Sequence, residues 1–302
     1  MTFSDVIITV AVSFVISAII VLIEIKSHKK EYQSNDVPIY GFTEKAERDI
    51  RVMTFNVRCS NVGRASMQDR IDLVCDTVLK SDADSCGVQE ATPEWMNAFK
   101  IHLGRKYAYV GVGREGGKKG EYSAIFYLKS KWRAVDSGTF WLSETPNEIS
   151  KGWDSELYRI CTWAILENKK TGEQYYHINS HFDHIGPIAR KESVDVVLRA
   201  MAEHKGLPCV FTADTNIREH EHCDLYEKMV SGVMADTKYT AKKSMEFCTY
   251  HAMDPLETNK NHVIDYVMIN NNFTANEYRV VTEGIDGCYV SDHYPVYADL
   301  SF

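Results

Sequence analysis

From residue 50 onward, the chain is a succession of short apolar runs that are separated by polar turns. Runs of this length that are rich in β-branched and aromatic residues are typical of buried β-strands. They predict strands at residues 51–57, 85–89, 107–112, 122–128, 134–141, 158–167, 174–181, 208–214, 263–269 and 295–301.

Longer stretches between these runs have helical periodicity and predict helices at 66–80, 93–103 and 187–204. The tight link at 168–172 implies an antiparallel pair of strands, whereas the strand–helix–strand stretches are typical of parallel pairs. The pattern therefore predicts an α/β (α+β) fold with mixed sheets and with helices outside them.

The start of the chain differs, because Val6–Ile23 contains no charged residue and its 18 residues are just enough to cross a bilayer as a helix. The alternatives are a buried core helix and a cleaved signal peptide, but the basic region of a signal peptide is absent. We expect a single-pass transmembrane anchor at 1–25, a polar linker at 26–49 and a catalytic domain at 50–302.

Basic residues flank only the C-terminal side of this segment, at Lys26, Lys29 and Lys30, which predicts that the catalytic domain lies in the cytoplasm. None of the eight cysteines forms a Cys-x-x-Cys pair, and most lie in apolar runs, as is typical of free thiols. We expect a membrane-bound protein from which removal of residues 1–45 leaves a soluble, active fragment.

The composition is that of one globular domain, with 44% hydrophobic and 25% charged residues. The formal net charge is −8 and no Lys/Arg-rich stripe is present, so nucleic acid, whose binding needs many basic contacts, is a less favoured partner. Nucleic acid stays an alternative because a small basic groove can lie within an acidic protein. The sequence indicates no obligate protein partner.

Polar side chains stand at or near the ends of several apolar runs. The clusters are Met53–Asn56, Gly87–Glu90, Ile178–His181, Val210–Asn216, Val263–Tyr266 and Ser291–Val296. One such ending is usually a turn. Six that combine carboxylate, amide and imidazole groups predict a single metal and phosphate site.

In this order, the Phe-Asn, Gln-Glu, Asn-x-His, Asp-x-Asn, Ile-Asp-Tyr and Ser-Asp-His motifs resemble those of the endonuclease/exonuclease/phosphatase superfamily. The resemblance covers about residues 50–302, and the stretches 113–117 and 137–146 resemble a bacterial branch. It implies two packed mixed β-sheets flanked by helices, in a four-layer sandwich like that of deoxyribonuclease. It also implies hydrolysis of phosphate esters.

Such hydrolysis needs in-line attack by water, neutralisation of the phosphoryl oxygens and help for the leaving oxygen. A hard cation held by a few carboxylates can neutralise the charge. The resemblance implies Mg²⁺ or Mn²⁺ on Glu90, with Asn56 and Asp292 completing or supporting the metal shell.

Asp214 and Asn216 project to the same side of an extended segment. The resemblance implies that Asp214 aligns or deprotonates the attacking water and that Asn216 binds phosphate. The chain departs from the family pattern at Ala213, where glycine is usual, and at Thr215, where phenylalanine is common. Ala213 lacks the conformational freedom of glycine, so the turn geometry is in question rather than the carboxylate.

Histidine can act as an acid, a base or a charged phosphate ligand near neutral pH. The resemblance implies that His293 helps to activate the water with Asp265 as its partner, and that His181 stabilises the phosphoryl oxygens from the other side. Glu121 resembles the glutamate that pairs with the histidine of the Asn-x-His motif in deoxyribonucleases, although a surface glutamate is the alternative.

Four further residues are candidates for contact with substrate. Arg159 stands where related nucleases have a phosphate-contacting arginine. Asp183 and His184 suit either a second metal or substrate, or else a hydrogen-bonded loop, and Arg58 suits either the pocket or a surface salt bridge. The run 220–224 contains His, Glu, Cys and Asp, but its spacing is typical of a polar loop rather than of zinc.

We therefore predict a metal-dependent hydrolase of phosphate esters, foremost a phosphodiesterase for a membrane-associated or small-molecule phosphodiester. A nuclease and a phosphomonoesterase are the enzymatic alternatives, because a fold does not select among substrates. A non-catalytic binding module is the alternative from a different class. It is disfavoured because the whole set of motif residues is present.

Overall fold

The computed structural model describes residues 30–35, 37–59, 65–253 and 262–302. The anchor expected at Val6–Ile23 lies outside these residues. Among the residues described, none of the helices combines the length and the apolar character needed to cross a bilayer.

Two mixed β-sheets form the centre of the molecule. The first has the order β10 (Lys243–Met245), β12 (Thr274–Val280), β13 (Val296–Ser301), β1 (Ile50–Asn56), β2 (Ser85–Ala91), β4 (Tyr122–Leu128) and β3 (Tyr107–Val110). The second has the order β5 (Trp132–Trp141), β6 (Ile160–Asn168), β7 (Gln174–His181), β8 (Cys209–Asp214), β11 (Asp265–Ile269) and β9 (Ala235–Asp236). β6 and β7 are antiparallel, as the short link between them predicts.

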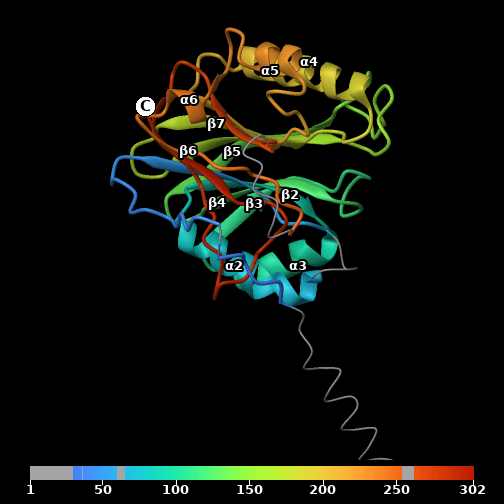
Figure 1. Ribbon diagram of the computed structural model, residues 1–302. Coiled ribbons are helices and arrows are strands. Elements are labelled where there is room, and N and C mark those ends of the chain that lie inside the picture. The colour runs from blue at the N-terminus through green and yellow to red at the C-terminus, as the bar shows by residue number, and fades with distance from the viewer. Residues whose placement is uncertain (1–29, 36, 60–64, 254–261) are drawn as a thin grey trace, which may run out of the picture.

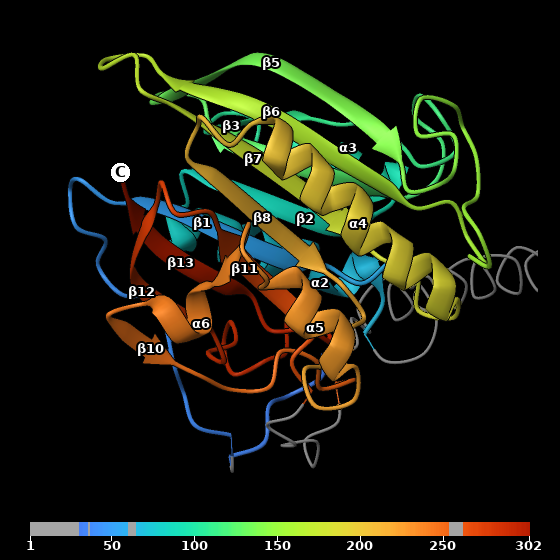
Figure 2. The ribbon, with the colours of Figure 1, turned by 90° about the horizontal axis from the view of Figure 1, so that it is seen from above.

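Helices cover the outer face of each sheet, which confirms the expected α/β arrangement of two packed sheets with flanking helices (Figure 1). α2 (Met67–Ser81) and α3 (Pro93–His102) lie on the first sheet, and α4 (Pro187–Glu203) and α5 (Cys223–Met229) lie on the second. Figure 2 shows α4 running across β6, β7 and β8. The short α6 (Thr237–Thr240) stands beside β12 and β11.

The ends of these helices have local causes. Thr92 accepts a hydrogen bond from the Trp95 amide at the start of α3, and a proline follows at the first helical position. Ser66 and Asp69 form a capping box at the start of α2. These features explain why two helices that the sequence predicts begin within one residue of the expected positions.

The apolar core has three parts that follow the layers. The middle part lies between the sheets and includes Val52, Ile125, Val210, Val267 and Val296. The outer parts lie under the helices, with Val74 and Phe99 on one side and Val194 and Val197 on the other. The strand ends therefore stand on a rigid, fully packed support.

The segment predicted as a linker packs against this domain in its described part. We define residues 30–35 and 37–45 as the N-terminal strap. Tyr289 donates its amide hydrogen to the Glu31 carbonyl at 2.8 Å, and Gln33 bonds Gly287, Gly284 and Thr282. The Thr282 amide donates to the Tyr40 carbonyl at 3.0 Å, and the Tyr40 amide donates to the Thr282 hydroxyl oxygen at 2.8 Å. The strap thus binds the loop that leads into Ser291, Asp292 and His293.

Candidate active site

The polar clusters at the strand ends converge on one edge of the two sheets. β1 and β2 are parallel and end at Asn56 and near Glu90, while β7 and β8 are parallel and end at His181 and Asp214. Asp265 begins β11, which is antiparallel to β8 and pairs with Asp214 in register. The topology therefore explains why Asn56 and His293, which are 237 positions apart in sequence, both lie next to Asp214.

Glu90 is aimed into the site by a break in β2. The register between β2 and β4 shifts between Val88 and Ala91, and Glu90 itself has a φ of 59°. A non-glycine residue rarely adopts this left-handed conformation, which is typical of functional sites. The Asn56 amide donates to one carboxylate oxygen at 3.0 Å and the Cys59 backbone N–H to the other at 2.8 Å. Burial alone would raise the pKa of Glu90, but these hydrogen bonds outweigh it and hold the pKa below its usual value.

Asp214 stands at the centre of the site. Its Oδ2 accepts from the Asn56 amide at 2.8 Å and lies 3.5 Å from His181 Nε2 and 3.8 Å from His293 Nε2. Its Oδ1 accepts the backbone N–H of Asn216, whose φ of 52° is also left-handed. Burial and then the adjacent Asp265 carboxylate raise the pKa of Asp214 to about 7.

His293 and Asp265 form the pair that the resemblance implies. His293 Nδ1 lies 2.9 Å from Asp265 Oδ2, and both side chains are buried. Burial alone would lower the pKa of His293, but the Asp265 carboxylate and then Asp214 outweigh it and raise the pKa to about 10. His293 is therefore an imidazolium at neutral pH in this environment.

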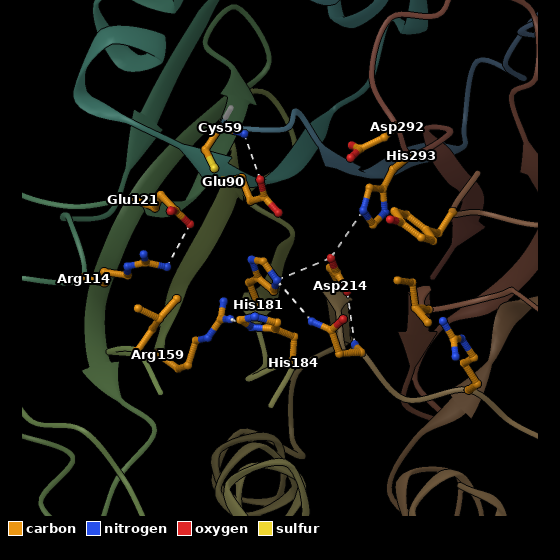
Figure 3. Close-up of a pocket in the computed structure, with 15 residues that line it drawn as sticks. Cys59, Glu90, Arg114, Glu121, Arg159, His181, His184, Asp214, Asp292 and His293 are labelled. Carbon is orange, nitrogen blue, oxygen red and sulfur yellow. Dashed lines mark hydrogen bonds and ion pairs between the residues drawn. The ribbon is translucent and has the colours of Figure 1, made fainter. Parts of the chain in front are cut away.

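His181 has the opposite electrostatic character. Burial and then the positive charge of Arg159 lower the pKa of His181 well below its usual value. Its Nε2 lies 3.2 Å from the Asn216 side-chain nitrogen. The site thus combines one charged and one neutral imidazole on either side of Asp214 (Figure 3).

The donor atoms fit a hard divalent cation. Two groups bring their ligand atoms within 4.8 Å of one another, Glu90 with His181 and Asp214, and Asp214 with Asp265 and His293. Burial and then the neighbouring Asp265 carboxylate both disfavour the charged form of Asp214 and raise its pKa, and a cation bound nearby would stabilise that form. The distribution differs from the set that the sequence predicts.

Asp292 belongs to neither of these histidine and carboxylate groups, and Asn56 lies beside the first of them. The Asn56 side-chain nitrogen faces Glu90 and Asp214, and its oxygen accepts from the Arg58 backbone N–H. Asn56 therefore orients the carboxylates. The Asp292 carboxylate lines the pocket and lies 3.6 Å from Arg58 Nε.

A cavity of about 410 Å³ opens in front of these groups. One side of it, which we define as the basic–acidic wall, consists of Arg114, Glu121, Arg159 and His184 (Figure 3). Glu121 forms an ion pair with Arg114 at 2.8 Å and, within the described residues, makes no hydrogen bond to His181. The partner implied for Glu121 is therefore replaced by Arg114.

The remaining candidates fall into two kinds. Arg159 and His184 line the cavity, with Arg159 Nη2 3.0 Å from His184 Nδ1. Asp183 is buried behind them, where it pairs with Arg159 and accepts the Gly186 and Ile185 amide hydrogens. Its arrangement is that of the hydrogen-bonded loop. Arg58 bonds Asp292 and the Ala65 carbonyl and does not line the cavity.

A buried polar network joins the two sheets behind the site. The Asn179 side chain donates to the Val88 and Ala124 carbonyls and accepts from Gln89 at 2.7 Å and Thr212 at 3.0 Å. A side chain at Gly87 would collide with Thr212 and Asn179. The Asn of the Asn-x-His motif thus lies in the core and connects the strands that carry Glu90, His181 and Asp214.

Sequence reasoning missed several lining residues, among them Cys59, Arg114, Tyr250 and Arg218. The glycine-rich stretch around Arg114 was a usable signal, because tight turns next to a site residue often bring a side chain into it. Tyr250 has no local signal, because it reaches the site through a β-bridge with His293, which lies 43 positions later in the sequence. The run at 220–224 forms a turn and the start of α5, where His222 Nδ1 accepts from the Arg218 amide.

The chain resembles several solved structures over most of its length. A mannosyl-6-phosphatase from Bacteroides thetaiotaomicron VPI-5482 is 34% identical, with 84% of this chain and 100% of that chain covered and a TM-score of 0.78. An endonuclease/exonuclease/phosphatase family protein from Bacteroides thetaiotaomicron is 32% identical, with 85% and 98% covered and a TM-score of 0.77. D. rerio TDP2, complexed with a single-strand DNA product, is 18% identical, with 85% and 100% covered and a TM-score of 0.67, and shares the fold.

A family model also matches. The model described as "Endonuclease/Exonuclease/phosphatase family" covers residues 53–293, which contain all six motifs. No curated protein matches the chain.

Proposed function

The chain belongs to the endonuclease/exonuclease/phosphatase family, and on this premise we propose that it is a divalent-metal-dependent enzyme that hydrolyses a small phosphate ester by in-line attack of water. The observation that carries the proposal is the single cavity that collects Glu90, His181, Asp214, Asn216 and His293. Each supplies a group that phosphoryl transfer requires.

Asp214 is the base in this proposal. Its carboxylate stands at the centre of the site, where Oδ2 lies 3.5 Å from His181 Nε2 and 3.8 Å from His293 Nε2, within reach of a water that attacks a phosphoryl group held between the two imidazoles. The Asn216 amide holds one Asp214 oxygen, so that the other faces the cavity and can take the proton of the attacking water. The charged His293, oriented by Asp265, donates to a phosphoryl oxygen, and the neutral His181 contacts the phosphoryl group from the opposite side with the Asn216 side chain.

The Glu90 carboxylate, which lies beside Asp214, would hold the cation. Mg²⁺ or Mn²⁺ bound there would neutralise charge on the phosphoryl oxygens and on the leaving oxygen. Asn56 and the Cys59 amide orient Glu90 for this task.

Phosphodiesters and phosphomonoesters are separate possibilities for the substrate. The prediction of a diester rests on the expected N-terminal membrane anchor, whereas the 34% identical relative, a mannosyl-6-phosphatase, supports a monoester of a sugar. The cavity volume of about 410 Å³ also suits a compound of monosaccharide size. We therefore favour a sugar phosphomonoester. The N-terminal membrane anchor and a cytoplasmic catalytic domain, which are expected from Val6–Ile23 and its flanking lysines, complete the proposal.

A hydrolysis panel tests this function. The purified protein with Mg²⁺ or Mn²⁺ is assayed on an aryl phosphomonoester, an aryl phosphodiester, a hexose 6-phosphate, DNA, RNA and phospholipid. We expect the hexose phosphate to give the highest kcat/KM, and an Asp214→Asn preparation, which controls for contaminants, to be inactive. Activity on none of these substrates, or equal activity in the Asp214→Asn preparation, would reject the proposal.

A further inference from the structure

The basic–acidic wall is the part of the cavity that the proposed chemistry leaves unexplained. It stands opposite Asp214 and beyond His181 (Figure 3). Arg114 and Glu121 are largely buried, with 13% and 19% of their side chains exposed, and are joined at 2.8 Å. Arg159, adjacent to them, is paired with Asp183. Two guanidinium groups are therefore each matched by a carboxylate.

This matching indicates what the wall can bind. A second phosphate would need excess positive charge, but the two arginines are already neutralised by Glu121 and Asp183. A lipid chain would need an extended apolar groove. Among the described residues that line the cavity, the aliphatic ones are Leu157 and Ile264, and these two are too few to form such a groove. The phenol ring in the lining, Tyr250, does not belong to the wall, and its centroid lies 4.9 Å from that of His293. The wall itself contains no Phe, Tyr or Trp, the side chains on which a nucleobase stacks best.

A neutral, polyhydroxylated group suits the wall. Each sugar hydroxyl donates one hydrogen bond and accepts others, so it needs a donor and an acceptor side by side. Arg114 and Glu121 provide this combination. A guanidinium has five N–H groups, and among the described residues Glu121 takes one hydrogen bond from the Arg114 side chain. Further N–H groups of Arg114 thus remain for a ligand.

The backbone holds the pair in place before any ligand arrives. Arg114 and Glu121 face each other across a tight hairpin, where the Arg114 amide bonds the Glu121 carbonyl at 2.9 Å. Gly116 and Gly120 have φ values of 92° and 74°, which side chains rarely adopt. The Trp141 indole N–H donates to the Arg114 carbonyl at 2.8 Å from the neighbouring sheet. A subsite that is rigid in this way loses little entropy on binding.

From this arrangement we propose that Arg114 and Glu121 form a subsite that binds hydroxyl groups of the alcohol part of the substrate, which is a sugar. Arg159 and His184 extend the subsite toward the phosphoryl position. The proposal rests on the proposed phosphoesterase function and adds the residues that select the substrate.

Binding and turnover test the two proposals separately. The Asp214→Asn protein with Mg²⁺ is titrated calorimetrically with mannose 6-phosphate and with phenyl phosphate, before and after the double substitution Arg114→Met/Glu121→Gln. We expect the double substitution to weaken binding of the sugar phosphate by about 10- to 100-fold, as loss of charge-assisted hydrogen bonds does, and binding of phenyl phosphate far less. Arg133→Met, which breaks the exposed Arg133–Glu167 pair, is the matched control and should change neither.

The single substitution Glu121→Gln should strengthen the binding of a ligand with a second phosphate rather than weaken it. Glu121→Gln leaves Arg114 without its countercharge, so we expect tighter binding of a hexose bisphosphate relative to the monophosphate. A merely structural role of the pair would not produce this reversal. Equal weakening for sugar and phenyl phosphate would overturn the subsite. Failure of the wild-type protein to hydrolyse any phosphate ester would overturn the proposed function instead.

Discussion

The two ends of β2 carry carboxylates in opposite surroundings, the buried Asp84 and the half-buried Glu90. Asp84, just before the strand, receives Lys45 Nζ at 2.6 Å, Lys131 Nζ at 2.7 Å and the Trp132 indole N–H at 2.8 Å. Burial alone would raise its pKa, but the two lysines outweigh it and lower the pKa. Glu90, at the other end, receives uncharged N–H donors from Asn56 and Cys59.

The surroundings of Glu90 lack cations to match their acids. Four carboxylates lie close together here, those of Glu90, Asp214, Asp265 and Asp292. Among the described residues, the cation at hydrogen-bonding distance from one of them is His293, which pairs with Asp265. Arg58 Nε lies farther away, 3.6 Å from the Asp292 carboxylate. A carboxylate whose charge is matched within the chain is part of the scaffold. Carboxylates that have too few cationic partners within the chain form a binding site for a metal cation from solution.

Removal of the metal should have the largest effect. Excess chelator should abolish phosphate ester hydrolysis, and Mg²⁺ or Mn²⁺ should restore it, because the acids around Asp214 need a cation that the chain does not supply. Glu90→Ala should weaken metal binding, measured calorimetrically, together with activity. Full turnover in excess chelator would show that the carboxylates at the Glu90 end of β2 do not form a metal site that the reaction needs.

The charged histidine provides the next test. His293→Ala should lower kcat by about 10²–10⁴-fold while the protein stays folded, because a positioned acid or electrostatic donor is lost. Asp265→Asn should act in the same direction, and the double variant should lose little more than His293→Ala, since Asp265 acts through the imidazole at 2.9 Å. Additive losses in kcat would show that Asp265 does not orient His293.

Asp84→Ala should instead reduce stability and leave kcat per folded molecule unchanged. The substitution leaves Lys45, Lys131 and the Trp132 indole without their acceptor, and breaking a buried pair costs about 3 kcal/mol or more. Urea unfolding measures this change. Lys228→Met, which breaks the half-exposed pair with Asp195, is the control, with an expected cost of at most about 1 kcal/mol. A loss of kcat in Asp84→Ala would argue against a purely structural role.

The smallest expected effect is a gain in stability. In chelated protein, Asp214→Asn should raise the free energy of unfolding by about 0.5–2 kcal/mol, because it removes one of the crowded charges. The pKa of Asp214 in the folded state, about 7, exceeds its ordinary value of 3.8, so its contribution to stability falls as pH rises between these values. The gain should therefore be present at about pH 8 and vanish at about pH 4. An equal gain at both would assign it to another cause.

The sequence predicts the role of the carboxylate at the Glu90 end of β2 but not that of the carboxylate at the Asp84 end. Glu90, His181 and Asp214 follow apolar runs, and parallel strands bring such ends together. Asp84 lies in a polar stretch that is indistinguishable from a surface turn until Lys45 and Lys131 fold onto it. β12 was missed for a related reason, since its polar sequence gives no apolar run and its burial depends on pairing with β13.

The residues of the site likewise divide into those that the sequence predicts and those that it does not. The Asp265–His293 pair is expected from motifs, whereas the Arg114–Glu121 pair and the Asn179 network depend on turn geometry and on how the sheets face each other. Local sequence reports which groups a strand end presents. It does not report which partner from another layer will neutralise them.

The N-terminal strap determines where the chain can be shortened. Its hydrogen bonds from Glu31, Gln33 and Tyr40 secure the loop at 282–289, which runs directly into Asp292 and His293. A fragment that begins at residue 46, which the sequence alone predicts to be soluble and active, would lose all of them and loosen the loop that leads to His293. A fragment that begins at about residue 30 would keep them, and is expected to melt at a higher temperature and to retain more activity. For crystallisation or assay, the useful start of the soluble protein lies ahead of the strap.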